Sequence, residues 1–546
     1  MSYLDVPRIH FAGKFYTDPS TVDNTPANFN PANTIKPEWN ANGYHYFLFQ
    51  NCKVTAAVLD ASGALKTSSA DDPIIGGSVA LSSNVTAQPK LVDLDTEWQT
   101  SSQIWGLKLA ISSGSDTIEG TLDTPTLRDL WMTRAPQKPG LKPGDTDLGP
   151  ASGAFQSVLR SLTYAPVAPG SSKVLNQFNG AGMLAIRFVA YAYDVVTKTG
   201  KTVGTIGIAR PNEPTQFSNA RRLEPAATVN PNFGPRVYFS PFGPAPFKLD
   251  EGRKRLIIDL GNSIPETSAG GAPPALGVMN ATVPTGKTTM VIGPLDYSLT
   301  HYEITAGVEE LPVTDAQIAA LKSNALQISV DGLPGKPVVL AERPTGTNVE
   351  TAETVLRMDP GDTNTIDLFA TRFGQAKTGQ AISARVTTGG RRTSAGLTFT
   401  VLGGGKTDAK GKLQIKFTAS DPGKARAADK IDGQIFLVEY DWGATKKGVA
   451  PDWRGRIVIK VFDTRASVAS PKWADVQDIF QEYARMYPSM KGILDLGVQA
   501  TVQAAKDRIK TTLSYPLTDP RYMPVSRDMS RDKKALILRW IAAGAP

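Results

Sequence analysis

The chain has 546 residues, 41% of them hydrophobic and 20% charged, which allows about two to four domains with sizeable cores. Its net charge of +8 is spread along the sequence, without a block of Lys and Arg interleaved with aromatic residues, so a nucleic-acid groove is not expected. No stretch approaches the roughly 20 apolar residues that a membrane helix requires, so no membrane span is expected.

Cysteine usage and the first residues bear on where the protein resides. Cys52 is the only cysteine, so no disulfide can form within the chain. Met1 is followed by polar and strand-patterned residues rather than by a basic and then apolar leader. We therefore expect a cytoplasmic protein, and export by a route without a leader stays open.

The first predicted element is a strand over residues 4–11. Its apolar residues alternate on either side of Pro7, which belongs at a strand edge or a bulge because it has no N–H to donate. Successive side chains point to opposite faces of a strand, so Arg8 and His10 share one face and the apolar residues the other. We expect Arg8 and His10 to hold the N-terminal sheet to the Pro- and Asn-rich loop over residues 18–37.

Short runs rich in Val, Ile, Thr and Phe follow, separated by turn residues. Together with 49 Gly and 40 Pro, this texture is typical of a β-rich fold with many turns. The runs predicted as strands lie at residues 46–49, 54–58, 79–81, 91–92, 104–111, 184–193, 201–210, 236–239 and 255–260.

Two short helices are predicted among these strands. One covers residues 155–162, and the other covers residues 314–321, where Thr314 can cap the first turn. We assign residues 1–336 to one N-terminal β-rich domain. A division into two subdomains is expected either near 136–150 or near 263–275, where Pro, Gly and Ser accumulate.

From residue 337 the predicted strands come at fairly regular spacing, with turn signals such as Asp359-Pro360-Gly361 between them. The segment from Leu413 to Phe417 alternates apolar and polar residues, which indicates a strand with one buried face. This pattern predicts an immunoglobulin-like β-sandwich over residues 337–465.

The last part, residues 466–546, is predicted to be helical. An apolar stripe from Val476 to Tyr487 marks a helix that Pro488 ends. Two further helices are expected near residues 502–509 and from about Ser530, and all three should pack on the sandwich or on a partner. The sequence thus predicts a mainly β fold: a large N-terminal β domain, an immunoglobulin-like β-sandwich and a small C-terminal helical tail.

Candidate site residues are few, because the chain has three histidines and no recognisable hydrolase or metalloprotease motif. His10 and His45 are candidate metal ligands, to which Asp93 and Asp95 would add carboxylate oxygens. No two histidines fall at the spacing of metal ligands. We therefore favour the alternative, a structural role for these residues at strand ends or turns.

Two other features have ordinary structural explanations. Cys52 among strand candidates is typical of a buried, inert thiol, although a Cys–His nucleophile formed with His45 is an alternative. The segments Gly286-Lys287-Thr288 and Gly405-Lys406-Thr407 end like phosphate-binding loops, but each lacks the first glycine of that motif. Both are expected to be turns.

The segment Leu4-Asp5-Val6-Pro7-Arg8-Ile9-His10-Phe11, followed by Gly13, resembles the start of a known family. It is similar to the N-terminal, non-ferritin-like region of VioB-type iminophenyl-pyruvate dimer synthases of violacein biosynthesis. The other segments that fit this family in order are residues 91–95, 104–106, 204–207, 221–223, 256–265, 483–488 and 522–530.

The same resemblance implies that the catalytic part is missing. Enzymes of this family are about twice this length, and their oxidative coupling of an imine derived from tryptophan is attributed to a further ferritin-like or haem-associated part. This sequence ends at Pro546 without the Glu-x-x-His pairs of a di-iron bundle. The resemblance therefore implies the non-catalytic part of such an enzyme, with no catalytic residue carried over and no cofactor predicted.

Three functions follow as hypotheses. The first is a non-catalytic scaffold or binding protein, similar to the accessory half of a VioB-like synthase, which docks a separate ferritin-like or oxidase-type protein. The second is an enzyme in amino-acid-derived, indole-type natural-product assembly, with His10 as base or ligand, Arg8 as carboxylate clamp and Asp95 as a further candidate. The third is a secreted or injected β-rich effector that binds a target surface through its immunoglobulin-like domain.

Overall fold

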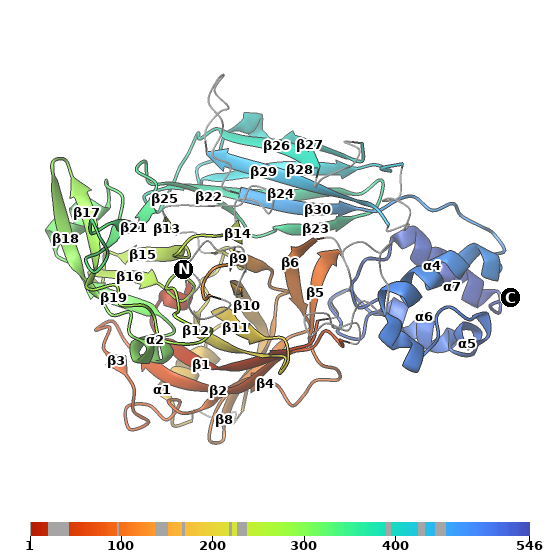
Figure 1. The fold of residues 1–546 in the computed structure, drawn as a ribbon, viewed down its shortest axis with the longest axis horizontal. Coiled ribbons are helices and arrows are strands. Elements are labelled where there is room, and N and C mark those ends of the chain that lie inside the picture. The colour runs from red at the N-terminus through yellow and green to blue at the C-terminus, as the bar shows by residue number, and fades with distance from the viewer. Residues whose placement is uncertain are drawn as a thin grey trace.

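The computed structural model describes residues 2–19, 43–95, 98–136, 151–165, 170–217, 221–225, 237–388, 395–423, 432–442 and 455–546. Within these ranges the protein is mainly β, as predicted, and its longest helices lie at the C-terminal end (Figure 1). Most of the predicted loop at 18–37 and most of the predicted break at 136–150 lie outside the described residues.

The largest sheet has eleven strands and belongs to the N-terminal part. They are β1 (Arg8–Thr17), β2 (Phe47–Val58), β3 (Leu65–Lys66), β4 (Ser78–Leu81), β7 (Lys108–Ser113), β8 (Asp116–Leu122), β9 (Leu127–Trp131), β10 (Ser152–Ala165), β11 (Leu184–Asp194), β12 (Thr199–Ile208) and β14 (Val237–Tyr238). The order β11-β12-β1-β2-β4-β7-β8-β10, with a further pairing between β10 and β11, closes eight of them into a barrel.

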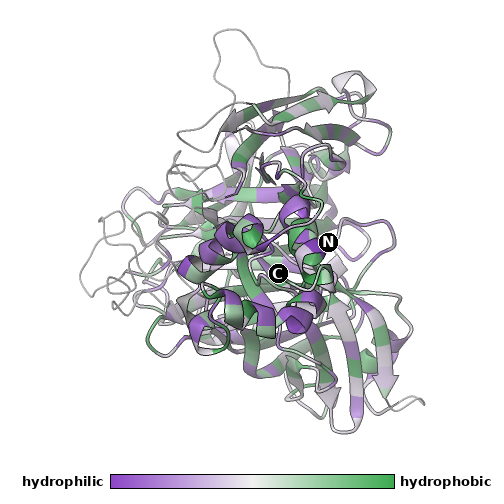
Figure 2. Cartoon of the chain, turned by 90° about the vertical axis from the view of Figure 1, so that its right-hand side faces the viewer, coloured by the Kyte–Doolittle hydropathy of each residue, from purple (hydrophilic) through white to green (hydrophobic). Residues whose placement is uncertain are grey.

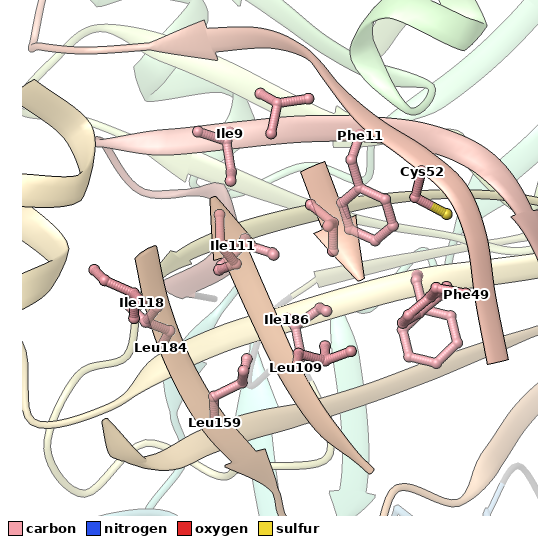
Figure 3. Packing of buried hydrophobic residues seen from close by; sticks show 14 of the residues in the cluster. Ile9, Phe11, Phe49, Cys52, Leu109, Ile111, Ile118, Leu159, Leu184 and Ile186 are labelled. Atoms are coloured by element: carbon pink, nitrogen blue, oxygen red, sulfur yellow. The ribbon is translucent and has the colours of Figure 1, made fainter. Parts of the chain in front are cut away.

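The inside of this barrel is filled by apolar side chains from strands all around it. Figure 3 shows Ile9 and Phe11 of β1 directed into this core, where Phe11 meets Phe49 edge-on at 5.8 Å between ring centres. Helix α1 (Lys173–Asn179) packs against β8 and β10, and helix α2 (Leu299–Thr305) packs against β1 from the other side. Both faces of β1 are therefore buried at residues 8–11.

The predicted helix over residues 155–162 is wrong, because these residues lie in strand β10. The first eight residues of β10 are all buried, so the apolar residues do not alternate with polar ones. A run that is apolar on both faces of a strand has the same appearance in sequence as a short buried helix.

A second sheet of eight strands follows in the chain. Its strands are β13 (Arg221–Pro225), β15 (Ala245–Asp250), β16 (Arg255–Asp259), β17 (Met279–Thr285), β18 (Thr288–Leu295), β19 (Val308–Pro312), β20 (Gln327–Val330) and β21 (Val338–Glu342). The chain leaves the barrel between β12 and β13, and residues 263–275 connect two strands of this second sheet. The domain boundaries remain predictions.

Helix α3 (Asp315–Leu321) lies beside the second sheet and confirms the helix predicted there. The Thr314 side chain accepts a hydrogen bond from the backbone N–H of Gln317, and the Gln317 side chain accepts one from the backbone of Thr314. This reciprocal capping box fixes the first turn of the helix.

An immunoglobulin-like sandwich of two sheets follows, as predicted. Its strands are β22 (Thr347–Thr351), β23 (Val355–Met358), β24 (Thr363–Arg372), β25 (Gln375–Ala376), β26 (Ile382–Thr388), β27 (Leu397–Val401), β28 (Lys412–Ala419), β29 (Gln434–Trp442) and β30 (Gly455–Val461). One sheet has the order β22-β24-β28-β27 and the other β23-β30-β29-β26, with one core between them.

A two-stranded hairpin, β5 (Lys90–Asp95) and β6 (Trp98–Trp105), packs against the sandwich beneath β23, on the side toward the helical tail (Figure 1). The tail contains α4 (Trp473–Met486), a 3-10 turn η5 (Pro488–Gly492), α5 (Gln499–Ala504), α6 (Lys506–Ser514) and α7 (Arg531–Ala542).

The tail helices are amphipathic, as the sequence predicts. Their apolar stripes share one core that includes Phe480 and Trp540, and Figure 2 shows hydrophilic residues along the outer side of the helices. The predicted second helix is divided at Ala505 into α5 and α6. No helix among the described residues is long and apolar enough to cross a membrane.

Candidate functional site

The opening strand places the candidates Arg8 and His10 inside the protein. The Nε–H of Arg8 donates to Nε2 of His10 at 3.3 Å, and Nδ1 of His10 lies 2.9 Å from Oγ1 of Thr205. Since the guanidinium only donates, we assign the proton of the neutral ring to Nδ1, which donates it to Thr205. Burial and the charge of Arg8 hold the pKa of His10 well below its usual value. Both ring nitrogens are therefore engaged within the protein.

Arg8 clamps a carboxylate, and this carboxylate belongs to the protein itself. Nη2 of Arg8 lies 2.5 Å from Oε2 of Glu310 in β19, and Nη1 donates to the backbone oxygen of Leu4 at 2.9 Å. Glu310 also pairs with Arg253 at 2.5 Å and with Arg255 at 3.5 Å. Burial lowers the pKa of Arg8, and Glu310 opposes this effect. Arg8 thus fastens the barrel to the second sheet.

The candidates Asp93 and Asp95 lie in β5, where the hairpin meets the sandwich. Oδ2 of Asp95 lies 2.8 Å from Nζ of Lys460 in β30, and both side chains are buried. Oδ1 of Asp93 accepts a hydrogen bond from Oγ of Ser102 at 2.5 Å, and burial raises the pKa of Asp93 to about 7. Asp95 therefore supplies the counter-charge of a buried lysine.

His45 is buried close to the helical tail. Its Nδ1 donates to the backbone oxygen of Leu91 at 3.1 Å, and its ring stands edge-on to Tyr487 with 6.1 Å between ring centres. Burial lowers the pKa of His45 to about 4, so the ring is neutral at pH 7. Its backbone has φ of 60°, a left-handed conformation that is uncommon for residues other than glycine.

The structure does not unite the predicted ligands His10, His45, Asp93 and Asp95 in a metal site. Across the described ranges there is no group of three or more His, Cys, Asp or Glu side chains placed to hold a metal ion. His10 is a buried residue of β1 whose ring contacts Thr205 of the neighbouring strand β12. Asp95 instead forms an ion pair with Lys460 of the sandwich. The enzyme hypothesis would need His10, Arg8 and Asp95 in one site. Arg8 and His10 contact each other, but Asp95 lies apart from them, in its ion pair with Lys460.

A cavity of about 270 Å³ lies where the helical tail meets the N-terminal part. Its lining is almost entirely apolar, which is the usual character of a small-molecule pocket. Its lining includes His45, Lys90, Tyr483, Tyr487, Arg508, Leu513, Met523 and Met529.

One wall of the cavity is held by hydrogen bonds within the tail. The hydroxyl of Tyr483 in α4 donates to Oδ1 of Asp528 at 3.2 Å, and Oγ of Ser526 donates to the same atom at 2.5 Å. Ser530 then caps α7 by accepting from the backbone N–H of Lys533 at 3.3 Å. These bonds hold the segment 522–530 against α4, so that Met523 and Met529 face the cavity.

The tail is docked on the hairpin and the sandwich beside this wall. Nη1 of Arg357 in β23 donates to Oε1 of Gln103 in β6 at 2.7 Å, and Nη2 lies 3.4 Å from the backbone oxygen of Ser526. Gly106 has φ of 72°, and a Cβ placed there would lie 2.6 Å from Cδ of Pro520. Only glycine allows this close approach of the hairpin to the tail.

Lys90 is the residue of this site that sequence reasoning missed. Its side chain is 8% exposed, and burial lowers its pKa to about 8. In sequence it is an ordinary lysine at the start of a strand, and nothing nearby signals burial. In the tail, the segments 483–488 and 522–530 both supply walls of the cavity.

Comparison with known proteins does not assign the chain to a family. No family model matches the sequence, and no curated protein matches it. Among solved structures, domains 4 and 5 of the S-layer protein SbsC align at 11% identity over 28% of this chain and 68% of that chain, with a TM-score of 0.15. The D0-D1 domain of intimin aligns at 11% identity over 39% of this chain and 92% of that chain, with a TM-score of 0.16. At these TM-scores the alignments carry no argument about function.

Proposed function

We propose that this protein is a non-catalytic binding protein that holds a small apolar molecule in the cavity between its helical tail and its N-terminal part. The observation that carries this proposal is the apolar cavity of about 270 Å³. An empty, apolar cavity of about 150 Å³ in another protein is large enough to bind benzene. A volume of this size and polarity therefore favours an organic ligand over ordered water.

The catalytic candidates His10, Arg8 and Asp95 are engaged in contacts within the protein, and this supports a binding role over a catalytic one. His10 is neutral with both nitrogens hydrogen-bonded, and Arg8 and Asp95 are each committed to an internal ion pair. A general base must reach the proton that it abstracts, and a buried, hydrogen-bonded ring does not.

The test is binding of N-phenyl-1-naphthylamine, an uncharged probe whose fluorescence rises in an apolar environment. The native protein should bind it saturably at one site, and Met529→Trp, which fills the cavity, should weaken binding about tenfold. Leu517→Trp is the control, because Leu517 is exposed and does not line the cavity. Absence of saturable binding, or equal binding by Met529→Trp, would overturn the proposal.

We also propose that the chain acts as the accessory half of a VioB-like assembly and docks a separate protein partner. The support is that four resembling segments, 91–95, 104–106, 483–488 and 522–530, lie at the junction of the hairpin, the sandwich and the tail. Purification from the native cell should then retain a stoichiometric enzyme partner. A protein that elutes alone at every salt concentration would count against this role.

A further inference from the structure

Lys90 places a buried ammonium group on the wall of the cavity. Its Nζ donates to the backbone oxygen of Tyr44 at 2.7 Å and lies 4.1 Å from the centre of the Tyr46 ring. Among the described residues no carboxylate lies within ion-pair distance of it. Asp18, the acidic group that acts on Lys90 from farther away, accepts hydrogen bonds from the backbone N–H groups of Tyr44 and Tyr46.

A second cation, Arg508, lines the same opening as Lys90. Arg508 in α6 is exposed and, within the described part of the chain, has no ion pair or hydrogen bond. Lys90, Arg508, Thr512 and Met523 line both the apolar cavity and an open groove that adjoins it. These four residues therefore mark the boundary at which an apolar interior meets solvent.

We infer that the molecule bound in the cavity, if it binds one as proposed above, is an apolar compound with one anionic head group, a carboxylate or an equivalent oxyanion. Its apolar body would lie among Leu513, Met523 and Met529, and its head group would lie between Lys90 and Arg508. The structure thus assigns the orientation of the ligand in the cavity as well as its position.

The electrostatic reason is the missing counter-charge. A charge removed from water is costly unless it is paired, and Lys90 is charged beside an apolar wall with a neutral carbonyl as its hydrogen-bond partner. An oxyanion there would accept the remaining N–H groups of Lys90 and the guanidinium N–H groups of Arg508. A cationic ligand would instead face two like charges.

The experiment compares two probes with the same rings. N-phenyl-1-naphthylamine is uncharged, and 8-anilinonaphthalene-1-sulfonate adds one sulfonate. Lys90→Met should weaken binding of the sulfonate about tenfold and leave binding of the uncharged probe unchanged. Arg508→Gln should act in the same direction, and because Arg508 is exposed this variant is expected to fold if Lys90→Met does not. Lys53→Met is the control for loss of an exposed positive charge.

Displacement of both probes by decanoate and by decanol extends the comparison to a carboxylate. Decanoate should displace them at a lower concentration than decanol from the native protein, and this advantage should be lost in Lys90→Met. If neither probe binds, the proposed binding function itself fails. If both probes bind and Lys90→Met and Arg508→Gln affect them equally, the binding function stands and the anionic head group is overturned.

Discussion

Lys460 and Asp95 form an ion pair in which both side chains are 1% exposed, with Nζ 2.8 Å from Oδ2. The pair joins strand β30 of the sandwich to strand β5 of the hairpin, residues that are 365 positions apart in the chain. The hairpin also carries Gln103, which accepts a hydrogen bond from Arg357 of the sandwich. Together these contacts hold the hairpin on the sandwich, next to the tail. An aspartate that the sequence offers as a metal or catalytic residue is thus part of the protein's internal framework.

Asp95→Ala should lower the free energy of unfolding by about 3–5 kcal/mol, because it leaves the ammonium of Lys460 buried without its counter-charge. Urea titration followed by fluorescence measures this. Asp315→Ala is the control, since Asp315 forms an exposed pair with Lys254 at 2.9 Å and should contribute at most about 1 kcal/mol. The double variant Asp95→Leu with Lys460→Met should recover most of the loss. Equal effects of Asp95→Ala and Asp315→Ala would contradict this role.

Glu310→Gln should destabilise the contact between the barrel and the second sheet. Its carboxylate pairs with the buried Arg8 at 2.5 Å, and the neutral amide would leave that guanidinium without a counter-charge. We expect a loss of about 3 kcal/mol and faster amide hydrogen exchange in β1. Glu303→Gln, which breaks a solvent-exposed pair with Lys201 at 3.3 Å, should change neither quantity appreciably. Unchanged exchange in β1 would show that Arg8 does not depend on Glu310.

Much of this fold follows from local pattern. The alternation from Leu413 to Phe417 predicts strand β28, which has one buried face, and the apolar stripe from Val476 predicts α4. Strand β10 cannot be predicted in the same way, because its first eight residues are buried on both faces of the strand. The periodicity of apolar residues indicates which side of an element faces water. It therefore cannot distinguish a strand from a helix where both sides are buried.

The candidate site is predicted only in pieces. His45 stands out in sequence because histidine is scarce, yet its neighbour Tyr487 is more than four hundred residues away, and no local signal joins them. Lys90 is distinguished by a burial that tertiary packing alone creates. The cavity forms where residues 43–45, Lys90 and the helical tail meet without filling the space between them. The pattern of residues along the sequence does not predict such a space.

Cys52 should be inert toward iodoacetamide at pH 8 in the folded protein. Its thiol is 2% exposed and donates to the backbone oxygen of Lys14 at 3.3 Å, and burial raises its pKa to about 12. The thiolate is the reactive form, so alkylation measured by mass spectrometry should require unfolding in guanidinium. Alkylation of the folded protein at the rate of the unfolded chain would contradict this and would revive a nucleophilic role.

His45 should make the protein less stable as the pH falls from about 6.5 to about 4. Burial lowers its pKa from 6.5 to about 4, with smaller contributions in the same direction from Lys90 and Arg527, while the carbonyl of Leu91 opposes them. Between these two pH values the unfolded chain binds a proton that the folded protein does not, so protons favour unfolding. The full penalty is about 3 kcal/mol, reached below pH 4.

The test replaces the titrating ring with a group that keeps its other properties. His45→Asn retains a donor for Leu91, and asparagine tolerates the φ of 60° at this position. The stability of the native protein relative to His45→Asn should therefore fall by about 3 kcal/mol between pH 7 and pH 4. His301→Asn should show the opposite sign, because a hydrogen bond with Glu309 raises the pKa of His301, so its stabilisation is present at low pH and lost as the pH rises. A pH-independent difference for His45→Asn would mean that the buried ring keeps its ordinary pKa, and would contradict the effect of burial on this residue.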